Sequence, residues 1–285
     1  MTFAHDVVRP ENLWQAWNLA PPVVLGIALA AWTYGVGVVA LRRKGHGPGS
    51  WRVLCFYAGL VAVVASLMSP LDALAGTLFS AHMVQHLMLI LIAAPLLVLG
   101  APVVPVTMAM PRTVRRTSRA VERVPVFDAA SRAVLNPLVV LALHSIALWA
   151  WHLPSPYQAA LSDDRLHGLE HVTFVATAML FWALVIGGGR RRRLGHGPAI
   201  VLTFVTALQS AALGVVLTFA STVLYQVHAG RTQAWGLTAL EDQQLAGAIM
   251  WIPAGIVYLG VMCALLAGWM KAMERPVTAG GEVRP

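Results

Sequence analysis

The chain has 285 residues, of which 58% are hydrophobic and only 11% are charged, and its formal net charge is +8. This composition excludes an ordinary soluble domain and is typical of a polytopic helical membrane protein. The positive charge would indicate a nucleic-acid partner only if the arginines formed one surface patch. They lie instead in short segments between apolar runs, so no nucleic-acid binding is expected.

Seven apolar runs are each long enough to cross a bilayer, and because backbone groups in lipid must be satisfied locally, each is predicted to be a helix. The predicted fold class is therefore all-α, a polytopic membrane bundle of seven transmembrane helices. The segment after the second run is expected to be a short bridge, and residues 153–165 and 225–241 are expected to be loops. The seven runs cover about residues 22–41, 51–69, 80–99, 136–152, 166–186, 198–223 and 242–270.

The basic residues predict the orientation of the chain. Of the 20 Lys and Arg residues, all but Arg9, Arg165 and Arg231 flank alternate ends of the spans or lie in the C-terminal tail. The positive-inside rule then places the N-terminus outside and the C-terminus in the cytoplasm. We expect a periplasmic segment at 1–21, a transmembrane domain at 22–270 and a cytoplasmic tail at 271–285. The first residues lack a signal-peptide pattern, so the first span is expected to be retained.

Histidines gather at one level of the predicted bundle. His82 and His86 open the third span, and His167 and His171 open the fifth, each pair four residues apart and so on one helix face. His144 and His152 lie in the fourth span. Ionisable groups within spans are costly and usually face a partner in the bundle interior. The six side chains, from three helices at a common depth, therefore predict a shared metal or cofactor site.

Copper is the metal that the neighbouring residues favour. Imidazole suits several transition metals, whereas thioether sulfur selects copper, especially Cu(I), and Met83 lies between the first two histidines. The two cysteines, Cys55 and Cys263, form no metal-binding pair and are interpreted as buried apolar residues. Because neutral imidazole is the ligand, metal affinity should fall as the pH drops through the histidine range.

Several polar residues near this level are predicted to support the site. Asp242 opens the last span, where its carboxylate can cap that helix or orient a ligating histidine, and the two roles stay open. Glu170 is expected to face another side of its helix and to be a surface or capping group. The predicted supporting residues are Asp242, Asp72, Met250 and Gln85.

Four stretches together resemble a known family. They are HMVQHLMLILIAAPLLVLGAP (82–102), HSIALWAWHLPSPYQAAL (144–161), HGLEHVTFVATAMLFW (167–182) and DQQLAGAIMW (242–251). In this order and spacing they resemble the polytopic CtaG-type cytochrome c oxidase assembly factors of bacteria, over about residues 69–258. The resemblance implies a seven-span inner-membrane protein that helps to deliver copper to a haem-copper oxidase. It implies oxidase subunits and a periplasmic copper chaperone as partners, besides membrane lipid, and it implicates His82, His86, His144, His152, His167, His171 and Asp242.

Three other functions are weighed against copper delivery. A haem-binding electron carrier would need two histidines on facing helices with room for a macrocycle, whereas pairs four residues apart suit a compact ion. A metal permease would need polar groups along the whole path, and the cytoplasmic halves of the spans offer few. A zinc hydrolase would need a placed general base, and the sequence has no HExxH motif. No catalytic residue and no enzymatic activity are predicted.

Overall fold

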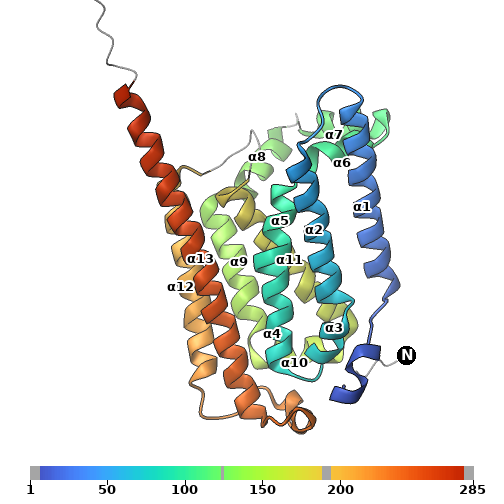
Figure 1. The fold of residues 1–285 in the computed structure, drawn as a ribbon, viewed down its shortest axis with the longest axis vertical. Helices are drawn as coiled ribbons and strands as arrows, with labels where there is room; N and C mark the ends of the chain where they lie inside the picture. The colour runs from blue at the N-terminus through green and yellow to red at the C-terminus, as the bar shows by residue number, and fades with distance from the viewer. Residues whose placement is uncertain (1–6, 123–124, 188–193, 279–285) are drawn as a thin grey trace, which may run out of the picture.

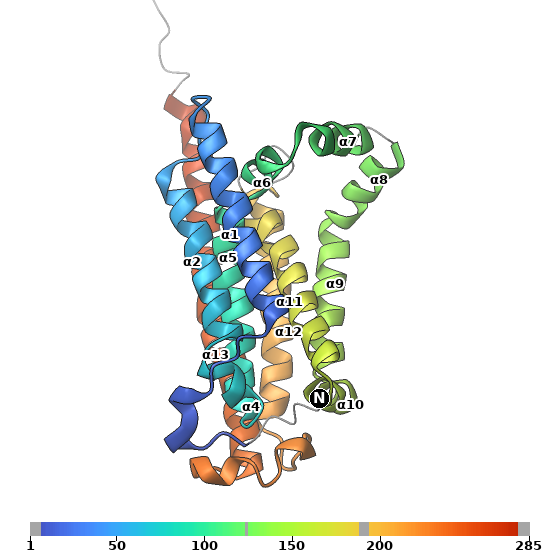
Figure 2. The same ribbon diagram turned by 90° about the vertical axis from the view of Figure 1, so that its right-hand side faces the viewer.

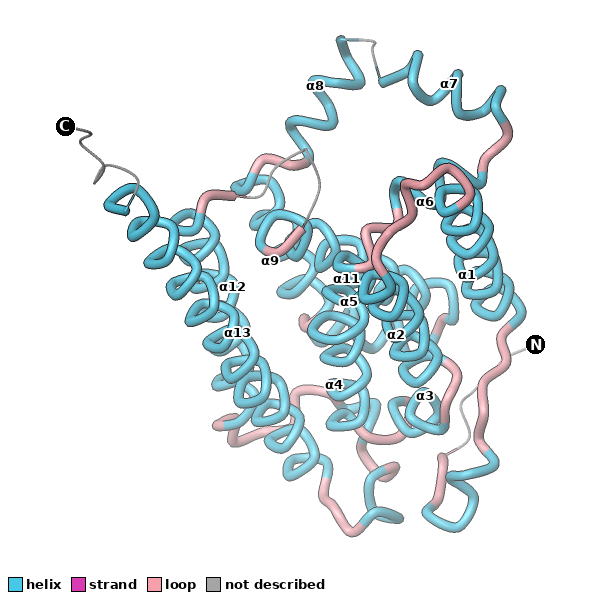
Figure 3. Tube along the Cα trace, turned by 45° about the horizontal axis from the view of Figure 1, so that its top comes forward, coloured by secondary structure: helices cyan, strands magenta, loops and turns pink. Residues whose placement is uncertain are grey.

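The computed structural model describes residues 7–122, 125–187 and 194–278, and within these ranges helices and connecting segments account for the whole fold. Long helices run side by side along the long axis of the molecule (Figure 1). No strand is present in the described part of the chain, as the tube view also shows (Figure 3). The predicted all-α class is therefore confirmed.

The helices follow one another with short connections. The N-terminal half contains η1 (Pro10–Gln15), α1 (Pro21–Arg42), α2 (Ser50–Leu67), α3 (Pro70–Ala75), α4 (Phe79–Leu87), η2 (Met88–Ala93), α5 (Ala94–Leu99), α6 (Val103–Ala109), α7 (Arg112–Glu122) and α8 (Pro125–Val134). The C-terminal half contains α9 (Pro137–Trp151), α10 (Pro154–Ser162), α11 (Asp164–Val185), α12 (His196–Thr218), η3 (Gln226–His228), η4 (Thr232–Trp235) and α13 (Ala239–Thr278).

Six helical stretches are long and apolar enough to span a membrane, and α9 with α10 makes a seventh if this bent pair counts as one span. The two helices of the pair meet at 76°. A proline opens each of them, at Pro137 and Pro154, where its missing N–H costs nothing and its fixed φ suits the first turn. The described residues therefore contain six or seven candidate spans, in agreement with the predicted polytopic bundle.

Several segments that the sequence presents as loops are helical. The stretch between the third and fourth spans forms α6, α7 and α8, and α7 runs crosswise to the long helices at one end of the molecule (Figure 2). Residues 153–165 were expected to be a polar loop, but they contain α10, whose Tyr157 and Ala160 are buried. This amphipathic segment gains from packing those two side chains against the bundle. The last helix likewise continues beyond residue 270, to Thr278.

The third span changes its helical geometry part-way along. Residues Met88–Ala93 form a π-helical turn between α4 and α5. In this geometry an N–H bonds to the carbonyl five residues earlier, and Pro95 has no N–H to offer to Ile90. The indole N–H of Trp182 on α11 donates instead to the Ile90 carbonyl, at 2.7 Å. The span therefore contains a π turn before Pro95, and a neighbouring helix bonds the carbonyl that this turn leaves open.

Helices α12 and α13 pack closely along a seam of small residues. A methyl group added at Gly247 would lie 2.5 Å from the Thr218 nitrogen and 2.7 Å from the Gly214 carbonyl oxygen. One at Gly214 would lie 2.8 Å from Cβ of Trp251. Close approach of backbones at small residues is a common way for helices to associate in lipid, where the hydrophobic effect cannot drive them together. The seam brings the start of α13 against the rest of the bundle.

We expect Gly247→Ala to destabilise the protein by about 1–3 kcal/mol, because the added methyl group overpacks the seam against backbone atoms that cannot move aside. Thermal unfolding of the purified protein in detergent measures the effect. Gly255→Ala is the matched control on the same helix, since nothing lies within 4 Å of a methyl group there. Equal unfolding temperatures for the two variants would contradict the packing argument.

Candidate metal centre

The first two candidate residues, His82 and His86, project from one face of α4, as their spacing predicts. Their ring centroids are 4.2 Å apart, and both side chains are buried. Two imidazoles in contact inside an apolar bundle need polar partners, because unpaired buried polar groups are costly. The neighbouring helices must therefore supply polar partners for the two rings.

Asp242 fixes the beginning of the helix that carries these histidines. Its buried carboxylate, on the first turn of α13, accepts hydrogen bonds from the backbone nitrogens of Phe79 at 2.7 Å and Ser80 at 3.1 Å, and from the Ser80 hydroxyl. A carboxylate at this end satisfies free N–H groups and interacts favourably with the helix dipole. Asp242 thus caps the neighbouring helix α4, and its predicted support of a ligating histidine stays a prediction.

Gln85 and Asp72 hold the other side of α4. The Gln85 side-chain amide donates to the Ser66 carbonyl at 2.8 Å and to the Asp72 carboxylate at 2.7 Å. The second oxygen of Asp72 accepts from the Asn18 amide at 2.7 Å. This buried network ties α4 to α2, α3 and the N-terminal segment. The two residues therefore restrain the helix that carries the histidines, and their further support of a metal ion stays a prediction.

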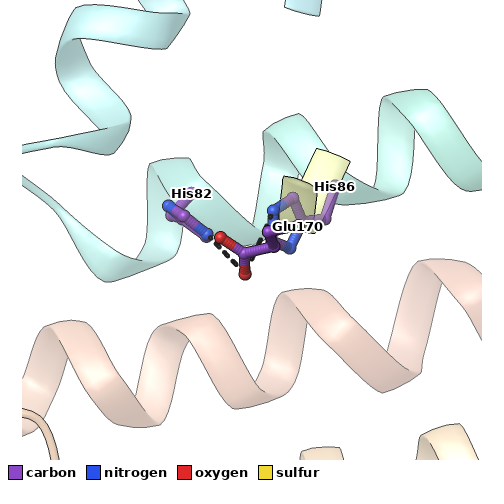
Figure 4. Close-up of side chains that lie close together, drawn as sticks. All are labelled: His82, His86 and Glu170. Carbon is purple, nitrogen blue, oxygen red and sulfur yellow. Dashed lines mark ion pairs between the residues drawn. The ribbon is translucent and has the colours of Figure 1, made fainter. Parts of the chain in front are cut away.

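The nearest partner of His82 and His86 is Glu170 on α11. One of its carboxylate oxygens lies 3.6 Å from Nε2 of His82 and 3.7 Å from Nε2 of His86, and its side chain is 1% exposed. Figure 4 shows the carboxylate pointing between the two rings. The expectation of a surface or capping group was wrong. Glu170 is three residues after His167, and residues so spaced lie on the same face of a helix. This spacing could have identified Glu170 as a residue of the site.

The three residues form a group that can hold a metal ion. One donor atom from each of His82, His86 and Glu170 lies within 4.8 Å of the other two. Metal–nitrogen and metal–oxygen bonds of about 2.0–2.2 Å require donors roughly 3–4 Å apart. The two measured nitrogen–oxygen distances fall in this range, so small side-chain rotations would complete the coordination. We call these three residues the histidine–glutamate site.

The hydrogen bonding of the histidine–glutamate site supports this interpretation. Among the described residues, neither ring nitrogen of His82 or of His86 has a hydrogen-bond partner, nor has the second carboxylate oxygen of Glu170. Leaving each such buried group unsatisfied costs about 1–3 kcal/mol. Five orphaned atoms on three mutually close side chains would make a poor structural core. The donor set fits a transition-metal ion, because imidazole and carboxylate are ligands for zinc, copper and iron.

The second histidine pair stands beside this site. The His171 ring lies 5.4 Å from that of His86, and the His167 ring lies 5.6 Å from that of His82, measured between centroids. His171 is buried, whereas His167 is only partly buried, one turn nearer the start of α11. The predicted meeting of the two pairs from the third and fifth spans is therefore observed. Whether His167 and His171 bind the ion directly stays a prediction.

The remaining predicted ligands lie around a neighbouring cavity. Nδ1 of His144 lies 3.0 Å from the Thr177 hydroxyl, and Nδ1 of His152 lies 2.7 Å from the Leu148 carbonyl oxygen. Both residues line a small cavity together with His86, Met83 and Met250. The single pocket that the sequence indicates is thus two adjoining compartments, and His86 contributes to both. The helix rotations that separate them are not encoded in residue spacing.

A histidine that was not among the predicted ligands closes the bundle near the site. Nδ1 of His228 lies 3.0 Å from the Thr77 carbonyl oxygen, and Nε2 lies 2.8 Å from the Tyr157 hydroxyl. A carbonyl only accepts, so Nδ1 carries the proton and Nε2 accepts from Tyr157. Burial lowers the pKa of His228 to about 4. The Tyr157 ring in turn packs 5.1 Å from that of His82, which links the loop to the site.

Comparison with known proteins identifies the family. Residues 32–272 match the family model described as cytochrome c oxidase caa3 assembly factor. The chain belongs to this family of caa3 oxidase assembly factors. The family is an assembly-factor family and not a known enzyme family, and the resemblance seen in the sequence is confirmed.

Mycobacterial proteins are among the relatives of this assembly-factor chain. The chain is 28% identical over 282 residues to the uncharacterized proteins Mb0105 of Mycobacterium bovis and MT0111 of Mycobacterium tuberculosis, and 26% identical to ML1998 of Mycobacterium leprae. These alignments cover 94–95% of this chain but 41% of each relative. The chain therefore spans about two fifths of the length of the curated relatives it matches. No solved structure matches it.

We expect Glu170→Gln to weaken metal binding by at least about 100-fold, the upper end of what loss of a supporting partner costs a metal site. The amide keeps the shape of the side chain but removes the charge. Competition against a chromophoric chelator, with copper and with zinc, measures the affinity in detergent. Glu274→Gln, which changes an exposed carboxylate on α13, is the control. Unchanged affinity in Glu170→Gln would remove this residue from the site.

A second expectation concerns acid stability. The folded-state pKa of His228 is about 4 and its ordinary value is 6.5, so the unfolded chain takes up the proton first. The contribution of His228 to the free energy of unfolding should be fully present above pH 6.5. It should fall by roughly 3 kcal/mol as the pH drops toward 4. In His228→Gln the amide can keep both hydrogen bonds without titrating. The variant should lose less stability than the parent protein across this window, and parallel curves would contradict the assignment.

Proposed function

We propose that this protein is a membrane-embedded copper-binding factor that helps to supply copper to a haem-copper cytochrome c oxidase during its assembly. The observation that carries the proposal is the buried histidine–glutamate site, His82, His86 and Glu170, inside a chain of the caa3 assembly-factor family. An assembly factor needs to hold its cargo and release it, and no chemical turnover is required.

The local charge and the nearby sulfur support copper as the metal. Zinc and iron share the imidazole and carboxylate donors, so the three ligands alone do not select one metal. A single carboxylate neutralises a monovalent ion, whereas a divalent ion would leave a net positive charge in an apolar interior, where unpaired charge is costly. The buried Met83 sulfur is close by, and thioether favours Cu(I).

The arrangement of α11 provides a route for the ion to this site. Asp163 and Asp164 are exposed at the start of the helix, where their charges attract cations. The partly buried His167 follows, and then the buried His171 beside His86. Donors therefore run from the surface into the bundle along one helix. In this proposal the outer residues collect copper, the histidine–glutamate site holds it away from water, and release follows the same path in reverse.

The proposed location follows from the distribution of charge. We place the protein in the bacterial inner membrane with the N-terminus outside and the C-terminal tail in the cytoplasm, as the positive-inside rule predicts. The ends of α3, α4 and α10 that surround the site lie at the end of the bundle that also carries the N-terminal segment (Figure 1). In this orientation the site faces the periplasm. Residues 1–21, 22–270 and 271–285 are the proposed periplasmic, transmembrane and cytoplasmic parts.

The proposed partners are subunits of the oxidase, which receive the copper, and a periplasmic copper chaperone, which supplies it. The other functions have less support. The cavity beside the histidines has a volume of only about 30 Å³, far too little for a haem macrocycle. On α12, the hydroxyls of Thr203 and Thr206 donate to carbonyls of their own helix, at 2.8 and 2.9 Å, as threonine commonly does within a helix.

We expect His82→Ala to leave the oxidase short of copper, because the histidine–glutamate site then lacks one of its three ligands. The variant replaces the native copy in a bacterium that makes a caa3 oxidase. Copper and haem contents and oxygen consumption are measured on the purified oxidase. His46→Ala is the control, since His46 is an exposed histidine in the turn after α1. A fully copper-loaded oxidase in the His82→Ala strain, with the variant present in the membrane, would overturn the proposed role.

A further inference from the structure

A small cavity adjoins the histidine–glutamate site, and its wall carries further imidazole and thioether groups besides His86. Met83 and His86 contribute from α4, His144 and His152 from α9 and its C-terminal cap, and Met250 from α13. All five side chains are buried. Imidazole and thioether groups from three helices thus face one cavity, beside apolar side chains such as Ile90 and Phe174.

Hydrogen bonding fixes the tautomer of His152. Its Nδ1 lies 2.7 Å from the Leu148 carbonyl oxygen, which can only accept, so Nδ1 carries the proton. In the neutral ring Nε2 then has a lone pair and cannot donate. Nε2 nevertheless faces the sulfur of Met83 at 3.5 Å. Thioether sulfur is also an acceptor only, so two electron-pair donors point at each other across a short gap.

This gap has the size that a metal ion requires. Bonds of about 2.0 Å to nitrogen and about 2.3 Å to sulfur place two ligands of one tetrahedral ion about 3.5 Å apart. The backbone of His152 is also held, because its carbonyl accepts from the Tyr225 hydroxyl at 2.6 Å. The donor pair is therefore positioned before any ion binds, which lowers the entropy cost of binding.

His144 shows the same tautomer on the same wall. The Thr177 hydroxyl donates to the Thr173 carbonyl at 2.8 Å, so it accepts from His144 at 3.0 Å, and Nδ1 carries the proton. The Nε2 atom of the neutral ring is then a lone-pair donor. Two histidines of the cavity are thus oriented by neighbouring groups in the manner of metal-ligating histidines, whose other nitrogen is usually hydrogen-bonded.

We propose that this cavity is a second metal site, which binds one Cu(I) ion through Nε2 of His152 and the sulfur of Met83, with Met250 as a further sulfur donor. Thioether and imidazole ligands without a carboxylate select Cu(I) over zinc and other divalent ions. The site adjoins the histidine–glutamate site, and His86 lines both. It gives the protein a compartment of softer donors directly beside the harder one.

Copper titration of the full-length protein tests the second site. The protein in detergent, kept anaerobic and reduced, is titrated with Cu(I) against a chromophoric Cu(I) chelator, and X-ray absorption identifies the ligand atoms. We expect two tightly bound Cu(I) ions per chain and sulfur among the ligands. Met83→Leu should remove one ion and most of the sulfur signal. This swap nearly conserves volume and should cost less than about 1.5 kcal/mol of stability.

Two further variants separate this proposal from the proposed function. Glu170→Gln should lose the ion of the histidine–glutamate site and keep the sulfur-bound one, so failure of one site leaves the other testable. Met273→Leu, at an exposed methionine on α13, should retain both ions. Unchanged Cu(I) stoichiometry in Met83→Leu, or the absence of sulfur ligands in the parent protein, would overturn the second site. Matching circular dichroism spectra of the variants confirm that each is folded.

Discussion

Burial of imidazole and carboxylate groups inside an apolar helical bundle is the constraint on which the rest of this structure depends. His82, His86 and Glu170 are almost inaccessible to solvent, yet five of their ring and carboxylate atoms have no hydrogen-bond partner among the described residues. Lipid on the outside and close-packed side chains on the inside offer these atoms no water. A metal ion here would bind one nitrogen of each imidazole and a carboxylate oxygen together, which gives these buried polar groups a common partner.

The surrounding residues position α4 more strongly than a packed helix needs. Asp242 bonds the first N–H groups of the helix, and Gln85 anchors its middle to Ser66 and Asp72. Trp182 bonds the carbonyl that the π turn leaves open. These contacts come from α13, α2, α3 and α11. The helix that carries His82 and His86 is thus fixed in rotation and height by its neighbours, as a binding site with pre-oriented ligands would require.

The sequence predicted those features that depend on composition and on spacing within one helix. Apolar runs gave the first five spans to within about two residues, whereas α12 ends at Thr218 and α13 at Thr278, against predicted ends at 223 and 270. The four-residue spacing predicted that His82 and His86, and likewise His167 and His171, share a face. What it could not supply is how far each helix is rotated and shifted against the others. That rotation brings Glu170 inward, sends His152 to Met83, and turns Asp242 toward α4. Amphipathic signals also failed where buried residues are few, as in α10.

The π turn in the third span shifts the register between the two halves of that helix. A π turn accommodates one residue more than the α-helix around it, so the faces before and after Met88–Ala93 are out of phase by about one residue. His82 and His86 can therefore point toward α11 while the residues of α5 pack in a register that a continuous α-helix would not allow. Deleting a single residue within the turn would restore a regular helix, but it would rotate one half of the span against the other.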